Sequence, residues 1–461
     1  MSSDLMNRRR HSDKHRQRRP FDKIEITSRS PAELKPHPDN PRQHTRRQIQ
    51  QLAHSIETFG FIVPVLVDAE SNVIAGHGRL LAARELGMTQ VPTICLHGLN
   101  ENQKLAFMIA DNRLTENSSW NENLLAQHLK SLSAVDLDFD IEVTGFAIGE
   151  IDIRIEGLNI VAPNSDDPAD ARRAEAQSPG VTKLGDIWQL GRHRLLCGSA
   201  LETCSYDVLM RSERAAMLFT DPPYNVRISG HVCGLGAIRH REFAMASGEM
   251  DRSEFCAFLS RVFSLAVQHS RSGSIHFVCM DWRHLADLLV ATRSIYSELK
   301  NICIWTKDNP GMGSFYRSQH EMVCVFKYGK KSSRNNIQLG IHGRNRSNVW
   351  AYRSVSSFGR ESEEGKLLAL HPTVKPVALV ADAILDCSSR GELILDPFAG
   401  SGTTIIAAER TGRRCFGIEI DPKYVDTIVR RFQAYTGLRA TNAVTGSLFN
   451  DIETGARHAE P

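Results

Sequence analysis

The segment Asp221-Pro222-Pro223-Tyr224 is the part of the chain best suited to chemistry on an amino group. Two prolines remove backbone donors and stiffen the turn, so the Asp221 carboxylate and the Pro222 carbonyl can offer only hydrogen-bond acceptors. An amino group on a nucleic-acid base carries two N–H donors, and its lone pair is delocalised into the ring. Two acceptors at these donors would favour a tetrahedral nitrogen and free the lone pair for attack, while Tyr224 stacks on the base for about 1–3 kcal/mol. A rigid surface turn is the alternative interpretation.

A glycine-rich turn, Asp396–Thr404, is the second candidate. It follows a strand-like run, Glu392–Leu395, and precedes a helical pattern, Thr403–Thr411, which predicts a place at the carboxyl edge of a sheet, where open α/β folds bind ligands. Glycines let the backbone approach such a ligand closely. Glu419 follows Gly400 by about 20 residues, the separation at which an acidic residue receives ribose hydroxyls in nucleoside-binding units. An ordinary tight turn is the alternative, and the presence of both segments favours a shared active site.

The elements that must position these segments lie within residues 181–438, where strand-like runs alternate with amphipathic stretches of helix length. This pattern is typical of a parallel sheet covered by helices. Because an amino group is inaccessible inside a duplex, the target nucleotide would have to rotate out into the pocket. The expected strands are Ala216–Thr220, Ser274–Cys279, Asn301–Trp305, Glu392–Leu395 and Arg414–Ile418.

Four blocks in this region, taken in order, resemble the amino-methylating DNA methyltransferases in which the catalytic tetrapeptide precedes the cofactor motif. The resemblance implies a Rossmann-like, doubly wound methyltransferase sheet and S-adenosylmethionine as the cofactor. A sulfonium is already activated, so catalysis needs in-line alignment and electrostatic complementarity rather than a covalent enzyme intermediate. The blocks are Asp221–Tyr224, His371-Pro372-Thr373-Val374-Lys375-Pro376, Asp396–Thr404 and Gly417-Ile418-Glu419-Ile420-Asp421.

The same resemblance assigns roles to individual residues. It implies that Asp221, Pro222, Pro223 and Tyr224 are catalytic and hold the flipped base. One departure is Gly198-Ser199, where the family often has Gly-Asp with a carboxylate that contacts the cofactor adenine, so adenine binding is expected to differ there. The cofactor-binding residues would be Asp396, Phe398, Gly400, Ser401, Gly402, Thr403 and Glu419, with Thr373 and Lys375 closing the pocket near the methionine end.

The expected substrate is double-stranded DNA, methylated at a specific site. Adenine N6 is the favoured target because the tetrapeptide begins with Asp221, as is usual in the adenine enzymes that this sequence resembles, whereas cytosine N4 enzymes more often begin with Ser. Cytosine N4 stays open as the alternative. Two polar stretches, Val226–Glu249 and Asp308–Ala369, hold many side chains suited to base edges and phosphates, with surface loops as the alternative interpretation.

The amino-terminal region contains Gly76-His77-Gly78-Arg79 between the strand-like run Asn72–Ala75 and a helical pattern that ends at Gly87. Backbone N–H groups at a helix start, together with an Arg side chain, can bind phosphate. This loop and three further segments, within residues 21–155, resemble the ParB/sulfiredoxin-like amino-terminal domain. The three segments are Leu34–Arg42, Val91-Pro92 and Ala110-Asp111-Asn112-Arg113.

ParB partition proteins bind a cytidine triphosphate with the corresponding Gly-Glu-Arg-Arg loop, but His77 and Gly78 replace its Glu and first Arg here. His77 also takes the place of the catalytic Cys of sulfiredoxin, which argues against reductase chemistry. We therefore expect a DNA-associated accessory module, in which nucleoside triphosphate binding is an open alternative and nuclease activity a further one without a catalytic cluster. The candidate nucleotide or phosphate contacts are Gly76, His77, Gly78, Arg79, Asn112 and Arg113.

Composition limits the class of protein. Apolar residues make up 41% and charged residues 24%, as in ordinary globular protein, and no apolar run has the roughly 18–20 residues that span a bilayer. Ten cysteines without a Cys-x-x-Cys pair indicate neither a zinc cluster nor a disulfide framework. We expect a cytoplasmic protein with no membrane partner and no metal.

The expected organisation is an α/β chain of two folded regions: a small ParB/sulfiredoxin-like domain at 21–155, then a methyltransferase domain at 181–438. A basic disordered tail at 1–20, with seven Arg or Lys against two Asp, could bind phosphate backbones or only aid solubility. Residues 156–180 form the expected linker and 439–461 a carboxyl-terminal tail. The competing hypotheses are a ParB-like DNA- or nucleotide-binding module with a degenerate methyltransferase half, and an RNA or protein methyltransferase. A homodimer stays open.

Overall fold

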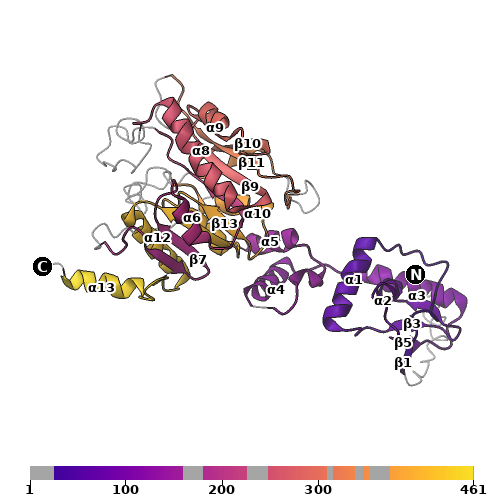
Figure 1. The fold of residues 1–461 in the computed structure, drawn as a ribbon. Helices are drawn as coiled ribbons and strands as arrows, with labels where there is room; N and C mark the ends of the chain where they lie inside the picture. The colour runs from indigo at the N-terminus through magenta and orange to yellow at the C-terminus, as the bar shows by residue number, and fades with distance from the viewer. Residues whose placement is uncertain are drawn as a thin grey trace, which may run out of the picture. The chain divides into compact units, whose positions relative to one another are not determined.

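The computed structural model describes residues 25–135, 137–158, 180–225, 248–308, 315–337, 346–353 and 374–459. The chain divides into two compact units, shown in Figure 1. The amino-terminal unit comprises Met1–Leu125 and Val135–Ala147, and the carboxyl-terminal unit comprises Ala126–Ala134 and Ile148–Pro461. The basic tail expected at 1–20 and most of the expected linker lie outside the described residues.

The amino-terminal unit is built on a five-stranded sheet with the strand order β1-β5-β3-β4-β2. Val65, Val73 and Val91 on these strands are fully buried and form its core together with Leu80. The strands are β1 (Ile26–Arg29), β2 (Lys35–Pro36), β3 (Val65–Val67), β4 (Asn72–Ala75) and β5 (Val91–Cys95). The helices of this unit are α1 (Arg46–Phe59), α2 (His77–Glu85), α3 (Glu101–Glu116) and the 3₁₀ helix η1 (Ile141–Thr144). Helix α4 (Glu122–Ala134) begins in residues assigned to this unit and ends in residues assigned to the carboxyl-terminal unit.

Helix α1 illustrates how local sequence sets these elements. Thr45 caps its start by accepting a hydrogen bond from the backbone N–H of Gln48 at 3.2 Å. Ala53 and Ile56, three residues apart, are buried on one face. Gly60 ends the helix with a φ of 82°, a backbone conformation that favours glycine. The cap, the buried face and the terminal glycine of α1 are thus all set by residues within the segment 45–60.

The carboxyl-terminal unit contains a ten-stranded sheet with the order β12-β10-β11-β9-β8-β13-β14-β7-β6-β15. Its five central strands, β9-β8-β13-β14-β7, run parallel to one another. The strands are β6 (Ile187–Leu190), β7 (His193–Cys197), β8 (Ala215–Thr220), β9 (Ser270–Met280), β10 (Glu298–Thr306), β11 (His320–Lys327), β12 (Val349–Ala351), β13 (Leu393–Asp396), β14 (Arg414–Glu419) and β15 (Thr441–Asn442).

Helices cover both faces of this sheet, which confirms the expected doubly wound α/β class. Successive side chains of β8 point to opposite faces: Met217 and Phe219 pack with α10, α11 and α12, whereas Leu218 packs with α6, α8 and α9. Figure 1 shows α8 and α9 together beside β9. The helices are α5 (Ile148–Gly157), α6 (Thr203–Met210), α8 (Arg252–Gln268), α9 (Leu285–Thr292), α10 (Val377–Cys387), α11 (Thr403–Arg410), α12 (Pro422–Thr436) and α13 (Phe449–Ala459).

The strands β8 and β13 form the switch point of the sheet. From β8 the chain continues through α8 to β9 on one side, and from β13 it continues through α11 to β14 on the other. The two connections therefore diverge outside the carboxyl ends of β8 and β13, which is the place where open α/β sheets bind ligands. Both predicted chemical segments begin at these two strand ends.

The structure corrects several expectations. The outer strands β6, β10, β11 and β15 pair antiparallel to neighbouring strands, so the sheet is mixed rather than parallel throughout. Strand β11 lies inside Asp308–Ala369, which was expected to contact DNA. Its apolar residues instead pair with β9 in the core.

Among the described residues, none of the helices has both the length and the apolar character needed to cross a bilayer.

The segment 439–461 is another correction, because its described residues are not a loose tail. They add strand β15 to the sheet edge beside β6 and form helix α13. Phe449 at the start of α13 is fully buried and packs edge-to-face on Trp188, with ring centroids 5.1 Å apart. A single buried aromatic residue thus ties the end of the chain to the core.

Helix α5 is fastened to the carboxyl-terminal unit by a buried charge. The Asp152 side chain is 1% exposed and pairs with Arg413 Nη2 at 2.7 Å and with Arg390 Nε at 2.9 Å. Arg413 is itself fully buried and also donates to the Ser388 carbonyl at 2.7 Å. The expected domain boundary at 155 therefore differs from the observed division, which assigns α5 from Ile148 onward to the carboxyl-terminal unit.

We predict that Asp152→Ala lowers the free energy of unfolding of the carboxyl-terminal unit by about 3–5 kcal/mol, because it leaves the buried guanidinium of Arg413 and the partly exposed one of Arg390 without their carboxylate. Urea unfolding followed by tryptophan fluorescence measures the change. Glu298→Ala is the matched control, because Glu298 pairs with Lys300 on the surface with 49% of its side chain exposed; we expect less than about 0.5 kcal/mol. Equal unfolding midpoints for the two variants would contradict the prediction.

Candidate active site

The carboxyl ends of four adjacent parallel strands carry the polar residues of the candidate active site. Asp221 follows β8, Asp396 ends β13 and Glu419 ends β14. Gly198 follows β7, whose last residue Cys197 lies opposite Glu419. Since β8, β13, β14 and β7 are neighbours in this order, the structure brings the two predicted chemical segments to the same edge of the sheet.

A hydrogen bond joins the two segments directly. Thr220, the last residue of β8, donates through Oγ1 to Asp396 Oδ1 at 2.9 Å. The same carboxylate accepts from the backbone N–H of Phe398 at 3.1 Å and from Thr404 Oγ1 at 2.6 Å. Burial raises the pKa of Asp396 to about 6, against the lowering effect of these donors. Through these hydrogen bonds, the buried Asp396 carboxylate holds the glycine-rich turn against β8 and the start of α11.

Glu419 closes the turn from the next strand. Its Oε2 accepts the backbone N–H of Gly400 at 2.8 Å and its Oε1 accepts that of Asp421 at 3.0 Å. Burial raises the pKa of Glu419 to about 7, although both backbone donors favour the ionised form. Each carboxylate oxygen retains acceptor capacity, so the group can also receive hydroxyl donors from a ligand.

The glycines of the turn are required by space and backbone geometry. Gly402 has a φ of 80°, and a Cβ added there would lie 2.7 Å from Cγ2 of Ile428. A Cβ on Gly417 of β14 would lie 3.2 Å from Cβ of Ala399. Arg431 fixes the turn from α12 by donating to the Ser401 carbonyl at 3.0 Å and to Thr403 Oγ1 at 3.2 Å. This close packing holds the backbone of the turn in one conformation at the start of α11.

Asp221 already makes two strong hydrogen bonds within the chain. Tyr224 Oη donates to its Oδ1 and Lys375 Nζ donates to its Oδ2, both at 2.5 Å. Burial raises the pKa of Asp221, while the ammonium of Lys375 acts in the opposite direction. Tyr224 is half-buried and packs against the cores on both faces of the sheet. Pro222 is buried and Pro223 is half-buried beside it.

Lys375 lies between the two halves of the site. Its main-chain carbonyl accepts from Thr403 Oγ1 at 3.3 Å, on the side of the glycine-rich turn. Its side chain extends to Asp221, and the ammonium is also 3.0 Å from Glu321 Oε2. The role expected for Lys375 was to close the cofactor pocket, whereas its charged end contacts the Asp-Pro-Pro-Tyr segment. Thr373, expected to do the same, lies outside the described residues.

Glu321 and Lys307 belong to this charged cluster and were not anticipated from the sequence. Glu321 is the second residue of β11, and Lys307 follows β10 in the adjoining antiparallel strand pair. Their side chains form an ion pair. Burial would raise the pKa of Glu321, but Lys375 and Lys307 lower it to about 2. A lysine and a carboxylate near facing ends of two adjacent strands could point to this pair, but only β10 is expected from the sequence, and the segment that forms β11 was expected to contact DNA.

Ser199, the departure from the expected Gly-Asp, lies at the same sheet edge. The backbone N–H of Gly198 donates to the Glu419 carbonyl at 2.9 Å, and Ser199 Oγ accepts from the Leu201 N–H at 3.3 Å. The hydroxyl thus serves a local turn next to Glu419. It offers a neutral group where a carboxylate was expected.

In the amino-terminal unit, Gly76–Arg79 joins β4 to α2 as expected. Gly76 has a φ of 95°, and the Nη2 of Arg79 donates to the Pro64 carbonyl at 3.4 Å. The Arg79 Nε is buried and makes no hydrogen bond. Gly78 is crowded, since an added Cβ would lie 2.9 Å from Cδ1 of Leu52. Burial lowers the pKa of His77 to about 4, so its imidazole is neutral at physiological pH.

The two other predicted contacts of this unit interact within α3. Asn112 donates to the Met108 carbonyl at 2.8 Å, and Arg113 pairs with Glu116 at 3.2 Å. Their neighbour Asp111 is the residue of α3 that acts electrostatically on Arg79, opposing the lowering of the Arg79 pKa by burial. The structure therefore links the loop to α3 through Asp111, and among the described side chains no hydrogen bond or ion pair joins it to Asn112 or Arg113.

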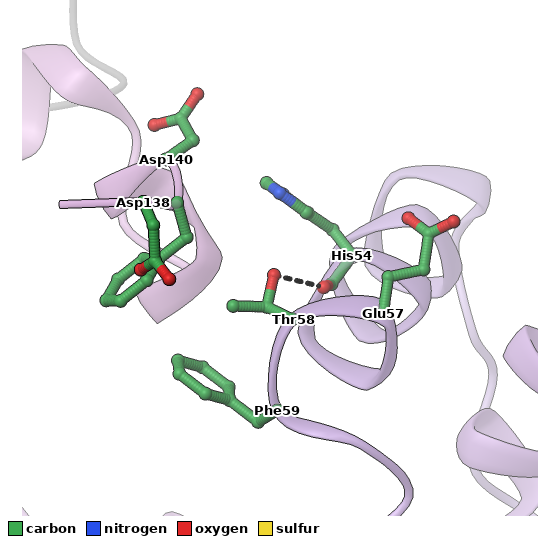
Figure 2. A pocket seen from close by; sticks show the side chains of 7 residues that line it. His54, Glu57, Thr58, Phe59, Asp138 and Asp140 are labelled. Atoms are coloured by element: carbon green, nitrogen blue, oxygen red, sulfur yellow. Dashed lines mark hydrogen bonds between the residues drawn. The ribbon is translucent and has the colours of Figure 1, made fainter.

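A separate pocket of about 650 Å³ lies between α1 and residues 138–140 of the same unit, as Figure 2 shows. Thr58 on its floor donates to the His54 carbonyl at 2.9 Å, and the carboxylates of Asp138 and Asp140 come from the facing segment. This pocket shares no lining residue with Gly76–Arg79. Within the described ranges, no cluster of three or more His, Cys, Asp or Glu residues could hold a metal ion.

Comparison with known families yields three matches along the chain. Residues 215–430 match a DNA methylase model of the N6/N4 class, residues 15–113 match the ParB N-terminal domain, and residues 123–184 match a ParB-methyltransferase HTH domain. The first two matches confirm the resemblances drawn from the sequence. The third covers α4 and α5 and was not anticipated.

Individual relatives cover separate parts of the chain. The ParB-like nuclease domain-containing protein YnaK of Escherichia coli is 46% identical over 83 residues, which are 18% of this chain and 95% of YnaK. The type II methyltransferase M2.DpnII of Streptococcus pneumoniae is 25% identical over 237 residues, or 49% of this chain and 85% of that protein. The crystal structure of the M1.HpyAVI-SAM complex is 18% identical with a TM-score of 0.36, covering 52% of this chain and 98% of that one.

The raised pKa of Glu419 predicts a pH-dependent stability. A buried acid whose folded pKa is raised from 4.5 to about 7 stabilises the folded state below pH 4.5, and this contribution is lost as the pH rises to 7. We therefore expect the ligand-free wild type to lose up to about 3 kcal/mol relative to Glu419→Gln between pH 4.5 and 7. Urea unfolding at a series of pH values measures the difference. A constant difference between the two proteins across this window would refute the assignment.

Proposed function

Since the chain belongs to the N6/N4 DNA methylase family and carries a ParB amino-terminal domain, we propose that it transfers a methyl group from S-adenosylmethionine to the exocyclic amino group of adenine, at N6, in double-stranded DNA. The observation that carries this proposal is the hydrogen bond from Thr220 to Asp396. It fixes the segment Asp221–Tyr224, which we call the acceptor corner, beside the glycine-rich turn. A methyl donor in the turn and an amino group at the corner would then meet across one strand spacing.

The residues of the turn fit the proposed cofactor. An added Cβ would meet Ile428 at Gly402 and Ala399 at Gly417, so close packing holds the turn in one conformation, and Glu419 offers carboxylate acceptors suited to ribose hydroxyls. We propose Asp396, Phe398, Gly400, Ser401, Gly402 and Thr403 as the remaining contacts. S-adenosylmethionine supplies an activated methyl group when bound, so these residues need only orient it and exclude water.

The residues of the corner suit an extruded base. The Asp221 carboxylate and the Pro222 carbonyl are acceptors without a competing donor on either proline, and they suit the two N–H groups of an exocyclic amine. Tyr224, with its ring on the same turn, would stack on the base. Adenine N6 and cytosine N4 present the same two donors. We propose adenine because the corner begins with a carboxylate.

We predict that the purified chain transfers labelled methyl groups from S-adenosylmethionine to duplex DNA, and that Asp221→Ala lowers the rate by at least about a hundredfold, the scale of losing one polar group that stabilises a transition state. Asp207→Ala is the matched control, because Asp207 lies on α6 with 63% of its side chain exposed; it should methylate like the wild type.

Digestion of the labelled DNA to nucleosides identifies the base. Label in N6-methyl-2′-deoxyadenosine supports the proposal, whereas label in N4-methyl-2′-deoxycytidine would show that the target is cytosine. Equal rates for Asp221→Ala and wild type would refute the catalytic assignment. Preferential labelling of RNA would support an RNA methyltransferase instead.

A second proposal concerns the amino-terminal unit, and the specific observation that favours it is the buried, unpaired Arg79 Nε beside the start of α2. We propose that this loop binds the phosphates of a nucleoside triphosphate through the backbone of Gly76–Arg79 and the Arg79 guanidinium. The neutral His77 would contribute a hydrogen bond rather than charge. Asn112 and Arg113 are proposed contacts from α3.

Titration of the full chain with cytidine triphosphate by calorimetry tests this second proposal. We expect saturable binding by the wild type and at least tenfold weaker binding by Arg79→Ala, about 1.4 kcal/mol. Arg113→Ala tests the proposed contact from α3, and we expect a smaller loss of affinity than for Arg79→Ala, because the Arg113 side chain is 68% exposed in its ion pair with Glu116. Absence of heat with the wild type, or identical affinity in Arg79→Ala, would overturn the proposal without affecting methyl transfer.

A further inference from the structure

Four side chains of alternating charge lie in a row at the acceptor corner: Asp221, Lys375, Glu321 and Lys307. Lys375 Nζ lies 2.5 Å from Asp221 Oδ2 and 3.0 Å from Glu321 Oε2, and Glu321 pairs in turn with Lys307. The row comes from four separate parts of the chain, and its centre is deeply buried, with only 4% of the Lys375 side chain exposed. Such a row needs all of its members, because each one compensates the charge of its neighbours.

In the ligand-free protein, each carboxylate oxygen of Asp221 already accepts one hydrogen bond, from Tyr224 Oη at Oδ1 and from the Lys375 ammonium at Oδ2. Each oxygen can accept a second donor, but an incoming amino group would then share that oxygen with the donor already bound in a buried site. Release of one of these donors would give the amino group an oxygen of its own. Lys375 is the partner with an alternative, since its ammonium already contacts Glu321 and can keep that bond after leaving Asp221.

Building on the function proposed above, we propose that Lys375 is a positioning residue that holds the Asp221 acceptor in place until the target base arrives, and that Glu321 then receives its ammonium. Before the base binds, the Lys375 ammonium donates to Asp221 Oδ2 in the place that the amino group of the base would take. The exchange replaces one N–H···O hydrogen bond with another, and the proton stays on Lys375. No covalent bond forms or breaks in this step.

The charges of the neighbourhood support such an exchange. Burial would lower the pKa of Lys375, but the carboxylates of Asp221 and Glu321 raise it, so the ammonium stays charged in both positions. The other titratable groups near this row are Tyr224, Cys279 and Asp396. Burial raises the pKa of each, so Tyr224 and Cys279 are neutral and contribute no opposing charge at neutral pH.

The row also has a consequence for the ionisation of Asp221. Without the Lys375 ammonium, Asp221 would be a buried carboxyl beside the negative charge of Glu321, and both burial and that charge raise its pKa. Without the charge of Glu321, the remaining ammonium would hold the Asp221 pKa lower. Substitutions at the two positions must therefore move the ionisation of the catalytic carboxylate in opposite directions.

The test is the pH dependence of single-turnover methyl transfer by the full chain, with labelled S-adenosylmethionine and saturating duplex DNA. Lys375→Met is expected to move the acid limb of the profile to higher pH by at least about one unit, the scale of losing an opposite charge within 4–6 Å. Glu321→Gln is expected to move the limb to lower pH. Glu321→Gln should also lower the plateau rate about tenfold, because the ammonium then has only a neutral amide oxygen as its second acceptor.

Lys300→Met is the matched control, because Lys300 is an exposed lysine on β10 whose partner is Glu298. Its profile should equal that of the wild type. Lys375→Arg keeps the positive charge, so its acid limb should stay near that of the wild type even if its plateau falls. This second variant also serves if Lys375→Met fails to fold, which thermal unfolding would reveal.

The possible outcomes separate this inference from the function on which it rests. If the wild type transfers no methyl groups, the proposed function and the inference fail together. If the wild type is active and Lys375→Met loses rate equally at every pH, Lys375 is merely structural and only the inference is overturned. Limb shifts in the same direction for Lys375→Met and Glu321→Gln would also overturn it, whereas opposite shifts would support it.

Discussion

The pairing of β8 with β13 is the constraint on which the rest of the carboxyl-terminal unit depends. These strands are separated by about 170 residues of sequence, yet Ile394 pairs with Met217 and Thr220 is hydrogen-bonded to Asp396. Every feature of the candidate site is placed relative to this pair: the acceptor corner extends from β8, the glycine-rich turn from β13, and Glu419 closes the turn from β14. If β13 were inserted elsewhere in the sheet, the same residues would lie on separated strand ends and share no chemistry.

The site concentrates buried charge, and the fold compensates it locally. Asp396 and Glu419 are satisfied by hydroxyl and backbone donors without a cation, and burial raises the pKa of both. Asp221 is instead matched by the ammonium of Lys375. Hydrogen bonds in such a dry environment are stronger than in water, and leaving one unmade is costly. The corner is therefore rigid and preorganised, which is what alignment of a donor and an acceptor requires.

Sequence reasoning located the parts of the site that are encoded within a few consecutive residues. Asp221–Tyr224 and Gly400–Glu419 each follow a strand whose apolar residues are recognisable locally, and the order of the motifs indicated the family. The same reasoning did not find Glu321, because its relevance depends on the antiparallel pairing of β11 with β9, and strand partners separated in sequence are not set by local patterns. For the same reason it took the segment around Phe449 for a tail, although Trp188, far away in the sequence, buries that ring. The direction of the Lys375 side chain likewise follows from three-dimensional neighbours.

Strands β13 and β14 carry site residues at their carboxyl ends and are held by ion pairs near their amino ends. Arg390 and Arg413 precede β13 and β14, and both are held by Asp152 of α5, which lies within the residues that match an HTH domain. The anchor of α5 therefore lies at the amino edge of the sheet, while Asp396 and Glu419 lie at the carboxyl edge of the same two strands. Strand β13 is buried throughout, β14 is buried except at Arg414, and each pairs with a strand on both sides. The same two short strands thus carry the attachment of α5 at one end and the residues of the glycine-rich turn at the other.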